Sequence, residues 1–288
     1  MEPAPRIRAA RDRADIDACV EVQRAVWGVS DLEIAGAIQL VATVYAGGLL
    51  LVAEDSPGRI VGFSYAFPAL RDGEPHLHSD MLAVLPAARG RGLGTRLKWA
   101  QREEALRRGV GLITWTFDPM QAGNARLNLR HLGATADELL PDFYGTTSSA
   151  LHHGLPTDRL EVRWELGSPS VEQRAGEKAS KPAAALLDAP RVNDVSLTDG
   201  QPVSATPRLD LQETAVLLEI PADWNGLVGA APDSAATWQR HVRTAFEAYF
   251  ARGYRAADLL TVTEKGRPRP RYVLYRFPTA SPSRPAGT

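Results

Sequence analysis

Short apolar runs and amphipathic segments alternate along the first 166 residues, an order that predicts a sheet with helices packed against it. Leu49–Glu54 and Ile60–Pro68 have strand length and are separated by a Pro-Gly turn. Gly94–Arg108 instead spaces apolar residues among charges, as an amphipathic helix does. The same reasoning predicts strands at Arg6–Ala9, Leu77–Leu85, Val110–Phe117 and Leu160–Leu166, and helices at Asp15–Val26, Ile34–Val44 and Asn124–Leu132.

From Gly167 to about Ala185 the apolar periodicity stops, and the Gly, Ser, Pro and charged residues there are typical of a linker. Beyond it, Ala235–Arg252 has the apolar stripe of a helix, and strands are predicted at Thr214–Ile220, Ala257–Val262 and Arg271–Phe277. We therefore expect a domain over residues 1–166, a linker over 167–185 and a smaller α/β extension over 186–288. The extension could complete the first sheet, cover a substrate site or join two copies in a homodimer, and the sequence does not choose.

One stretch, Ile34–Ala53, approaches the ~20 apolar residues of a membrane-spanning helix. Gly47 and Gly48 interrupt it, and the segment that follows them has the length of a buried strand. The pattern therefore favours helix, turn and strand, and we expect no association with a membrane.

Composition narrows the class of protein. The 33 basic and 34 acidic residues nearly cancel, which argues against a nucleic-acid binder that works through a general basic field. Cys19 is the single cysteine, so we expect a buried thiol, no disulfide and a cytoplasmic protein. His131, His152 and His153 form no persuasive set of ligands with the available carboxylates, so we expect no metal.

Chemistry is concentrated where an apolar strand enters the loop Arg89-Gly90-Arg91-Gly92-Leu93-Gly94 and an amphipathic helix leaves it. Glycines let successive backbone N–H groups converge, and a helix N-terminus adds partial positive charge, so this loop can cradle a pyrophosphate. On the glycines alone, a plain strand-to-helix turn is an equal alternative. The loop has neither the Gly-x-x-x-x-Gly-Lys-Ser/Thr nor the Gly-x-Gly-x-x-Gly spacing of other nucleotide sites.

The loop does fit an Arg/Gln-x-x-Gly-x-Gly/Ala signature, and here the chain resembles the GNAT superfamily of CoA-dependent N-acyltransferases. The resemblance runs from about Arg6 to Leu166 and implies an α/β (α+β) fold with a mixed, mostly antiparallel central sheet flanked by helices. It is closest to a subfamily whose further motifs are found here at Leu77 to Val84, Thr114 to Pro119, Asn124 to Leu129, Phe143 to Gly145 and Thr157 to Arg159.

The resemblance implies which residues bind the acyl donor. Backbone amides of Leu82, Ala83 and Val84 would bind the pantetheine arm and polarise the thioester carbonyl, as acyl transfer requires. Acetyl-CoA is the usual donor of the superfamily, and the subfamily makes succinyl-CoA an alternative, with Arg126 or Arg130 as the cation for its carboxylate. The pyrophosphate would lie on Arg89, Gly90, Arg91, Gly92, Leu93 and Gly94, and Asn124 would contact the arm of the cofactor.

An amine acceptor arrives protonated, so the transfer needs a base for its proton and then an acid for the CoA thiolate. Strand alternation puts His76, His78, Asp80, Leu82 and Val84 on one face. His78 is the predicted base because an ordinary histidine pKa, about 6.5, lies near the working pH, and Asp80 would orient it or contact the substrate ammonium. A histidine held by structural hydrogen bonds is the alternative.

The usual acid of the family, a Tyr four residues before the Gly that ends the later helix, is replaced here by Leu129. Tyr144 is the predicted substitute, with a packed aromatic as the alternative. The sequence thus predicts an enzyme that acylates the primary amine of a small molecule, such as an amino acid, by direct attack. Two further alternatives stay open, a degenerate acyl-CoA-binding sensor or scaffold and a protein-lysine acetyltransferase, while the balanced charge disfavours RNA.

Overall fold

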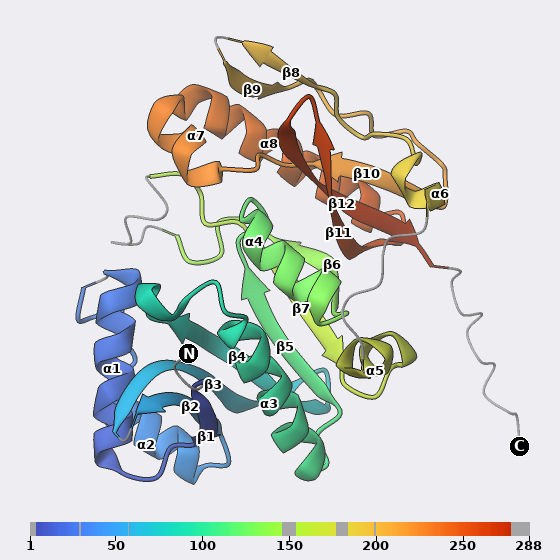
Figure 1. Ribbon diagram of the computed structural model, residues 1–288. Helices are drawn as coiled ribbons and strands as arrows, with labels where there is room; N and C mark the ends of the chain where they lie inside the picture. Colours follow the sequence, from blue (N-terminus) through green and yellow to red (C-terminus); the bar gives the residue numbers. More distant parts are fainter. Residues whose placement is uncertain are drawn as a thin grey trace, which may run out of the picture.

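The computed structural model describes residues 4–28, 30–56, 58–145, 154–176, 184–198 and 200–277 (Figure 1). Ten strands form one sheet in the order β1-β2-β3-β4-β5-β7-β6-β11-β12-β10, and β8 and β9 pair separately. The strands are β1 Arg6–Ala9, β2 Leu49–Ser56, β3 Arg59–Arg71, β4 Glu74–Val84, β5 Leu112–Phe117, β6 Thr135–Leu140, β7 Arg159–Glu165, β8 Val195–Thr198, β9 Gln201–Ser204, β10 Ala215–Glu219, β11 Tyr254–Glu264 and β12 Arg267–Arg276.

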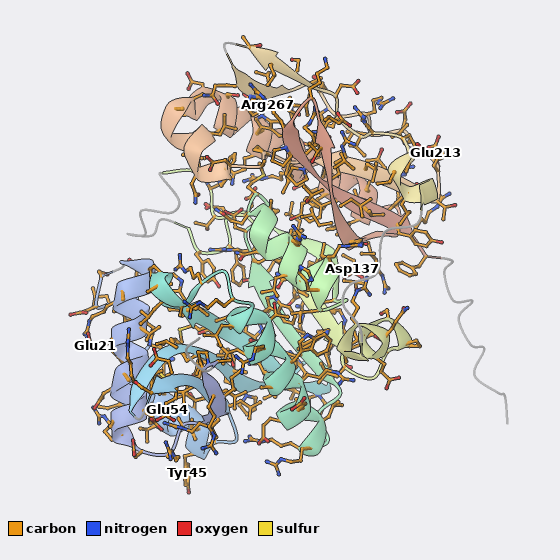
Figure 2. All side chains as sticks on the ribbon, viewed as in Figure 1. Glu21, Tyr45, Glu54, Asp137, Glu213 and Arg267 are labelled. Carbon is orange, nitrogen blue, oxygen red and sulfur yellow. The ribbon has the colours of Figure 1, made fainter. Side chains whose placement is uncertain are left out.

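Helices cover the sheet. Asp12 caps α1 by accepting a hydrogen bond from the Asp15 amide, and α1 and α2 pack their apolar residues against one face of β2–β4 while α3 packs against the other. Tyr45, at the end of α2, points away from the body of the protein (Figure 2). The helices are α1 Arg13–Trp27, α2 Ala37–Tyr45, α3 Leu93–Arg107, α4 Ala122–Ala125, α5 Pro169–Gly176, α6 Ala184–Leu187, α7 Trp224–Ala230 and α8 Pro232–Phe250, with short turns η1 Pro86–Ala88 and η2 Arg126–His131.

The sheet is mixed and mainly antiparallel, as predicted: β4 and β5 are parallel, and the other paired neighbours run antiparallel. The strands of the C-terminal extension continue this sheet through one β6–β11 pair, Ala136↔Ala256. The extension therefore completes the sheet of the first domain, which is one of the three roles that the sequence left open. The domain boundaries themselves stay a prediction.

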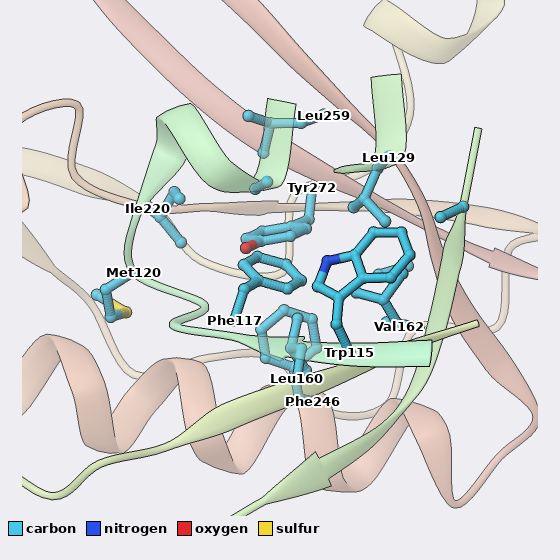
Figure 3. Packing of buried hydrophobic residues seen from close by; sticks show 14 of the residues in the cluster. Trp115, Phe117, Met120, Leu129, Leu160, Val162, Ile220, Phe246, Leu259 and Tyr272 are labelled. Carbon is cyan, nitrogen blue, oxygen red and sulfur yellow. The ribbon is translucent and has the colours of Figure 1, made fainter. Parts of the chain in front are cut away.

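One large apolar cluster spans both halves of the molecule (Figure 3). Trp115 and Phe117 of β5 lie in the same cluster as Phe246 of α8 and Tyr272 of β12. The Tyr272 hydroxyl donates a 2.7 Å hydrogen bond to the Pro119 carbonyl, which satisfies a buried polar group at this junction. The extension therefore shares the core of the first domain.

Most predicted elements are confirmed within a few residues, but several regions differ. Helix α5 lies inside the predicted linker, because Val171 is buried at 1% exposure and Arg174 Nε donates to the Arg130 carbonyl at 2.9 Å. The single helix expected over Asn124–Leu132 is a short α-helix followed by the π-helical η2. Strand β6, the β8–β9 hairpin and α7 were not predicted, and 177–183 of the linker lie outside the described residues.

The stretch tested as a membrane span is helix α2, a turn and strand β2, as predicted. No helix among the described residues is both long and apolar enough to cross a membrane.

Candidate active site

The two parallel strands β4 and β5 separate shortly after they meet. They pair only at Leu77↔Ile113 and His78↔Thr114, whereas β5 pairs with β7 along its whole length. Beyond the His78↔Thr114 pair, the edge of β4 that faces β5 has no strand partner among the described residues. We call this opening the fork, and the His78↔Thr114 pair lies at its crotch.

Backbone alternation decides which of the predicted amides face the fork. The Leu85 amide donates to the Val61 carbonyl of β3 at 2.9 Å, and the β3–β4 register places Ala83 opposite Phe63. Since alternate residues of an antiparallel strand direct their N–H groups to the same neighbour, Ala83 also turns its amide to β3. The amides of Leu82 and Val84 therefore point toward the fork.

A β-bulge in β4 changes which side chains share a face. Tyr65 pairs with Met81 and Phe67 pairs with His78, so β4 has one additional residue across this interval. Directly paired residues share a face, which places His78 with Met81 on the α1/α2 side. Leu82 and Val84 instead pack against α3, so the predicted single face from His76 to Val84 is wrong for these two residues.

His78 is half-buried at the crotch. Its Nδ1 lies 2.9 Å from Thr114 Oγ1, with the proton on either atom, and its ring centroid lies 5.3 Å from that of Phe67. Burial, and then the positive charges of His76 and Lys98, lower the pKa of His78 to about 4. The imidazole is therefore neutral near pH 7, able to accept a proton but a weaker base than the ordinary pKa predicted.

Asp80 lies at the bulge, two residues beyond the crotch. Solvent reaches its side chain, yet the surrounding protein raises the pKa of the carboxyl by desolvation. Burial, and to a smaller degree the negative charge of Asp80, raises the pKa of Tyr65. No ion pair involving Asp80 occurs within the described ranges, so the carboxylate is available to a substrate cation.

Tyr144 reaches β5 from the turn after β6. Its hydroxyl lies 3.4 Å from Thr116 Oγ1, and its amide donates to Thr157 Oγ1 at 2.8 Å. Thr114 and Thr116 are two residues apart on one strand, so they present the same face about 7 Å apart. The structure thus brings Tyr144, which is 52% exposed, to the same side of β5 as His78. Leu129 is fully buried in the apolar core, so the position of the usual acid has no proton donor.

The glycine loop leaves the N-terminus of α3 free of side-chain caps. Gly90 and Gly92 have φ of 77° and 70°, a conformation that L-residues adopt at a cost, and Gly92 is the N-cap of α3. Arg89 Nε donates to the Val84 carbonyl at 3.0 Å and so ties the loop to the end of β4. A cavity of about 380 Å³ adjoins the loop and is lined partly by Arg59, Arg91 and Arg96.

Of the remaining predicted residues, some are buried or already paired and others are exposed to a ligand. Leu93 is buried, and a Cβ on Gly94 would meet Leu82 at 3.7 Å, so both also pack α3 onto the sheet. Asn124 is exposed on α4, where it can reach a ligand. Arg130 donates to Asp258 at 2.6 Å and is already paired, whereas Arg126 is exposed.

Residues 19–133 match the sequence pattern of the Acetyltransferase (GNAT) family. These residues form a GNAT domain. They include the fork, the glycine loop and α4, so the predicted family is confirmed, while the subfamily motifs stay a prediction.

Three solved structures are similar. The yncA protein of Salmonella typhimurium, with its cofactor acetyl-CoA, is 24% identical over 58% of this chain and 98% of its own, with a TM-score of 0.47. The ribosomal-protein-alanine N-acetyltransferase of Brucella melitensis is 25% identical over 55% and 98%, with a TM-score of 0.44. The GNAT N-acetyltransferase YhbS of Escherichia coli, in complex with CoA, is 21% identical over 59% and 87%, with a TM-score of 0.39. No curated protein matches the sequence.

The extension supports the GNAT domain beside Tyr144. Arg243 of α8 donates to both carboxylate oxygens of buried Asp158, at 2.9 and 2.5 Å, and Asp158 also accepts the Asp142 amide at 3.0 Å. The loop that carries Tyr144 is therefore held by a helix more than 80 residues away in sequence. Asp158 lies in one of the predicted subfamily motifs, but nothing in the sequence indicated its partner.

A second cavity, of about 820 Å³, lies in the extension and is lined partly by Glu219, Trp238 and Arg269. None of the predicted site residues lines it. No cluster of three or more His, Cys, Asp or Glu within the described ranges could hold a metal, and His152 and His153 lie outside those ranges.

Proposed function

We propose that the protein transfers an acyl group from acyl-CoA to the primary amine of a small molecule, such as an amino acid, by direct attack. The fork carries this proposal. An extended, amide-bearing arm such as pantetheine can lie beside β4 as a missing strand would, and the Leu82 and Val84 amides point toward it. One of these amides would polarise the thioester carbonyl as charge develops on its oxygen.

The glycine loop supports the same orientation of the donor. The uncapped amides at the start of α3 suit a pyrophosphate, and Arg91 adds positive charge beside them. Asn124 would contact the arm. The acyl end of a donor held this way would lie near the crotch, within reach of His78.

The side chains at the crotch suit an amine acceptor. Asp80 would attract the ammonium group, neutral His78 would take its proton, directly or through water, and Tyr144 would donate a proton to the departing sulfur. Acetyl-CoA is our first choice of donor. Succinyl-CoA stays an alternative that now rests on Arg126, because Arg130 is paired with Asp258.

Two other functions remain as alternatives. A sensor or scaffold would keep the fork and loop without turnover, which the Leu129 substitution favours. A protein-lysine acetyltransferase would use the same chemistry on a larger acceptor. A cytoplasmic location also belongs to the proposal, since it rests on the single cysteine.

The decisive experiment measures release of free CoA from acetyl-CoA and from succinyl-CoA with pooled L- and D-amino acids, polyamines and lysine peptides. We expect turnover with one class of small amine. Tight binding of CoA by calorimetry without turnover on any acceptor would replace the enzyme with the sensor. Turnover on lysine peptides alone would select the protein-lysine acetyltransferase.

A further inference from the structure

Lys98 of α3 is buried in the GNAT domain and has not entered the proposed mechanism. Its side chain is 2% exposed, and Nζ donates to Ser79 Oγ at 3.0 Å and to Gln101 Oε1 at 2.8 Å. Nζ also lies 3.7 Å from the centroid of the Trp115 ring. Within the described part of the chain, no carboxylate forms an ion pair with this amine.

The position of Lys98 relates it to the fork. Ser79 and Trp115 are the first residues after the His78↔Thr114 pair on β4 and β5. Neighbouring residues of a strand face opposite sides of a sheet, and the contacts of Lys98 show that Ser79 and Trp115 face α3. The amine therefore lies at the crotch from one side of the sheet, while His78 lies there from the other.

This arrangement is unfavourable for the stability of the fold alone. Burial lowers the pKa of Lys98 well below its ordinary value, and the Trp115 ring only partly offsets this by favouring the ammonium form. Gln101 Nε2, also buried, has no hydrogen-bond partner among the described residues. Two buried donor groups thus converge with too few acceptors, which is the setting in which an added negative charge is stabilised most strongly.

We propose that Lys98 is a positioning residue for acyl transfer that acts through Ser79 on the negative charge developing at the thioester in the fork. The inference rests on the proposed function. The ammonium group donates to Ser79 Oγ, so the Ser79 hydroxyl can direct its own hydrogen to the carbonyl oxygen and then to the departing sulfur. No proton is transferred in this step. The electric field of the buried ammonium group strengthens the hydrogen bond that the Ser79 hydroxyl donates.

The role predicts a distinctive dependence on pH. The charged form of a lysine with a lowered pKa is lost as the pH rises through that lowered value, so kcat should fall on the alkaline side below the ordinary range of lysine. On β4, which lies against α3, His78 is the titratable group whose pKa responds to the charge of Lys98, and His76 and Asp80 lie on the same strand. The amine also lies near Trp115 of β5 and Trp164 of β7, and it donates to Gln101 of α3.

The experiment compares Lys98→Met with Lys265→Met, an exposed lysine in the β11–β12 turn. We expect Lys98→Met to lower kcat by roughly 10²–10³. The KM for the acyl donor should stay within about threefold, and Tm should be unchanged or higher, because the variant removes a buried amine. Lys265→Met should change neither kinetics nor Tm.

Ser79→Ala and the double variant test the connection between the two residues. If Lys98 acts through Ser79, Ser79→Ala should lower kcat comparably and the double variant should be no slower than either single variant. Lys98→Arg, if folded, should retain part of kcat and lose the alkaline fall.

The possible outcomes distinguish a failure of the role of Lys98 from a failure of the proposed acyltransferase function. A Lys98→Met enzyme within threefold of the normal kcat, or additive losses in the double variant, would overturn the role of Lys98 alone. Absence of turnover by the unmodified protein with every donor and acceptor would overturn the proposed enzyme and this inference together.

Discussion

The C-terminal extension and the fork bury charge in opposite ways. In the extension, Glu219 is buried with Arg269 and Arg271, and Glu264 accepts from Arg271 at 2.6 Å and from Arg191 at 3.0 Å. Around the fork, His78, Asp80 and Lys98 form no ion pair with any described residue, and desolvation shifts their pKa values. Paired buried charges specify a structure, whereas unpaired ones are expected where an enzyme must respond to a substrate.

The largest expected effect concerns His78, on the unpaired side of the comparison. His78→Ala should lower kcat by roughly 10²–10⁴, because it removes the proton acceptor at the crotch. CoA affinity by calorimetry should be unchanged, since the Leu82 and Val84 amides and the loop remain. A variant with near-normal kcat would return His78 to a structural role.

Arg271→Met should have a slightly smaller effect, and on stability instead. Removing this guanidinium leaves the buried Glu219 carboxylate with fewer partners, and breaking such a buried pair costs about 3–5 kcal/mol of unfolding free energy. Urea unfolding would measure the loss. The folded fraction should keep its kcat, and a large loss of kcat without a loss of stability would contradict the contrast between the extension and the fork.

The pH dependence of stability gives a third test, of smaller size. The pKa of His78 is about 4 in the folded protein, below its ordinary value, so the unfolded chain binds the proton first as the pH falls. The stability contributed by the neutral ring is present above about pH 6.5 and is lost as the pH falls towards 4. Unfolding at several pH values should show this slope, and His78→Gln should flatten it. An unchanged slope in that variant would assign it to other groups.

The smallest effect is expected for Arg13→Met on α1. Arg13 pairs with Asp17 at 2.7 Å, but both side chains are more than half exposed. Such a pair contributes less than about 0.5 kcal/mol. If urea unfolding showed a loss of several kcal/mol in unfolding free energy, the exposure of an ion pair would not predict its contribution to stability.

Local sequence patterns predicted most of the first domain, because its strands and helices bury regular apolar faces. Alternation failed in β4, since a bulge adds a residue that no pattern of apolar positions reveals. The burial of Lys98 was not predicted, because a lysine in an amphipathic helix usually faces water. Its burial depends on Ser79 and Trp115 from two other strands.

The extension was less predictable for a related reason. Glu219 and Arg271 are each typical of a surface, and only their pairing across β10 and β12 allows them to be buried together. Strand β6 has two acidic residues among six, so its sequence does not show a strand. The ion pair of Arg243 and Asp158 could not be predicted for the same reason, because neither local sequence indicates a contact with a distant segment.

The shared core also bears on how the chain folds. Trp115 and Phe117 of the GNAT domain share one apolar cluster with Phe246 and Tyr272, so residues 1–166 alone would lack part of their core and present an apolar surface to water. A fragment ending there should aggregate, and the full chain should unfold in one cooperative transition. During synthesis, the core of the first 166 residues would therefore stay incomplete until the last strands of the chain had been made.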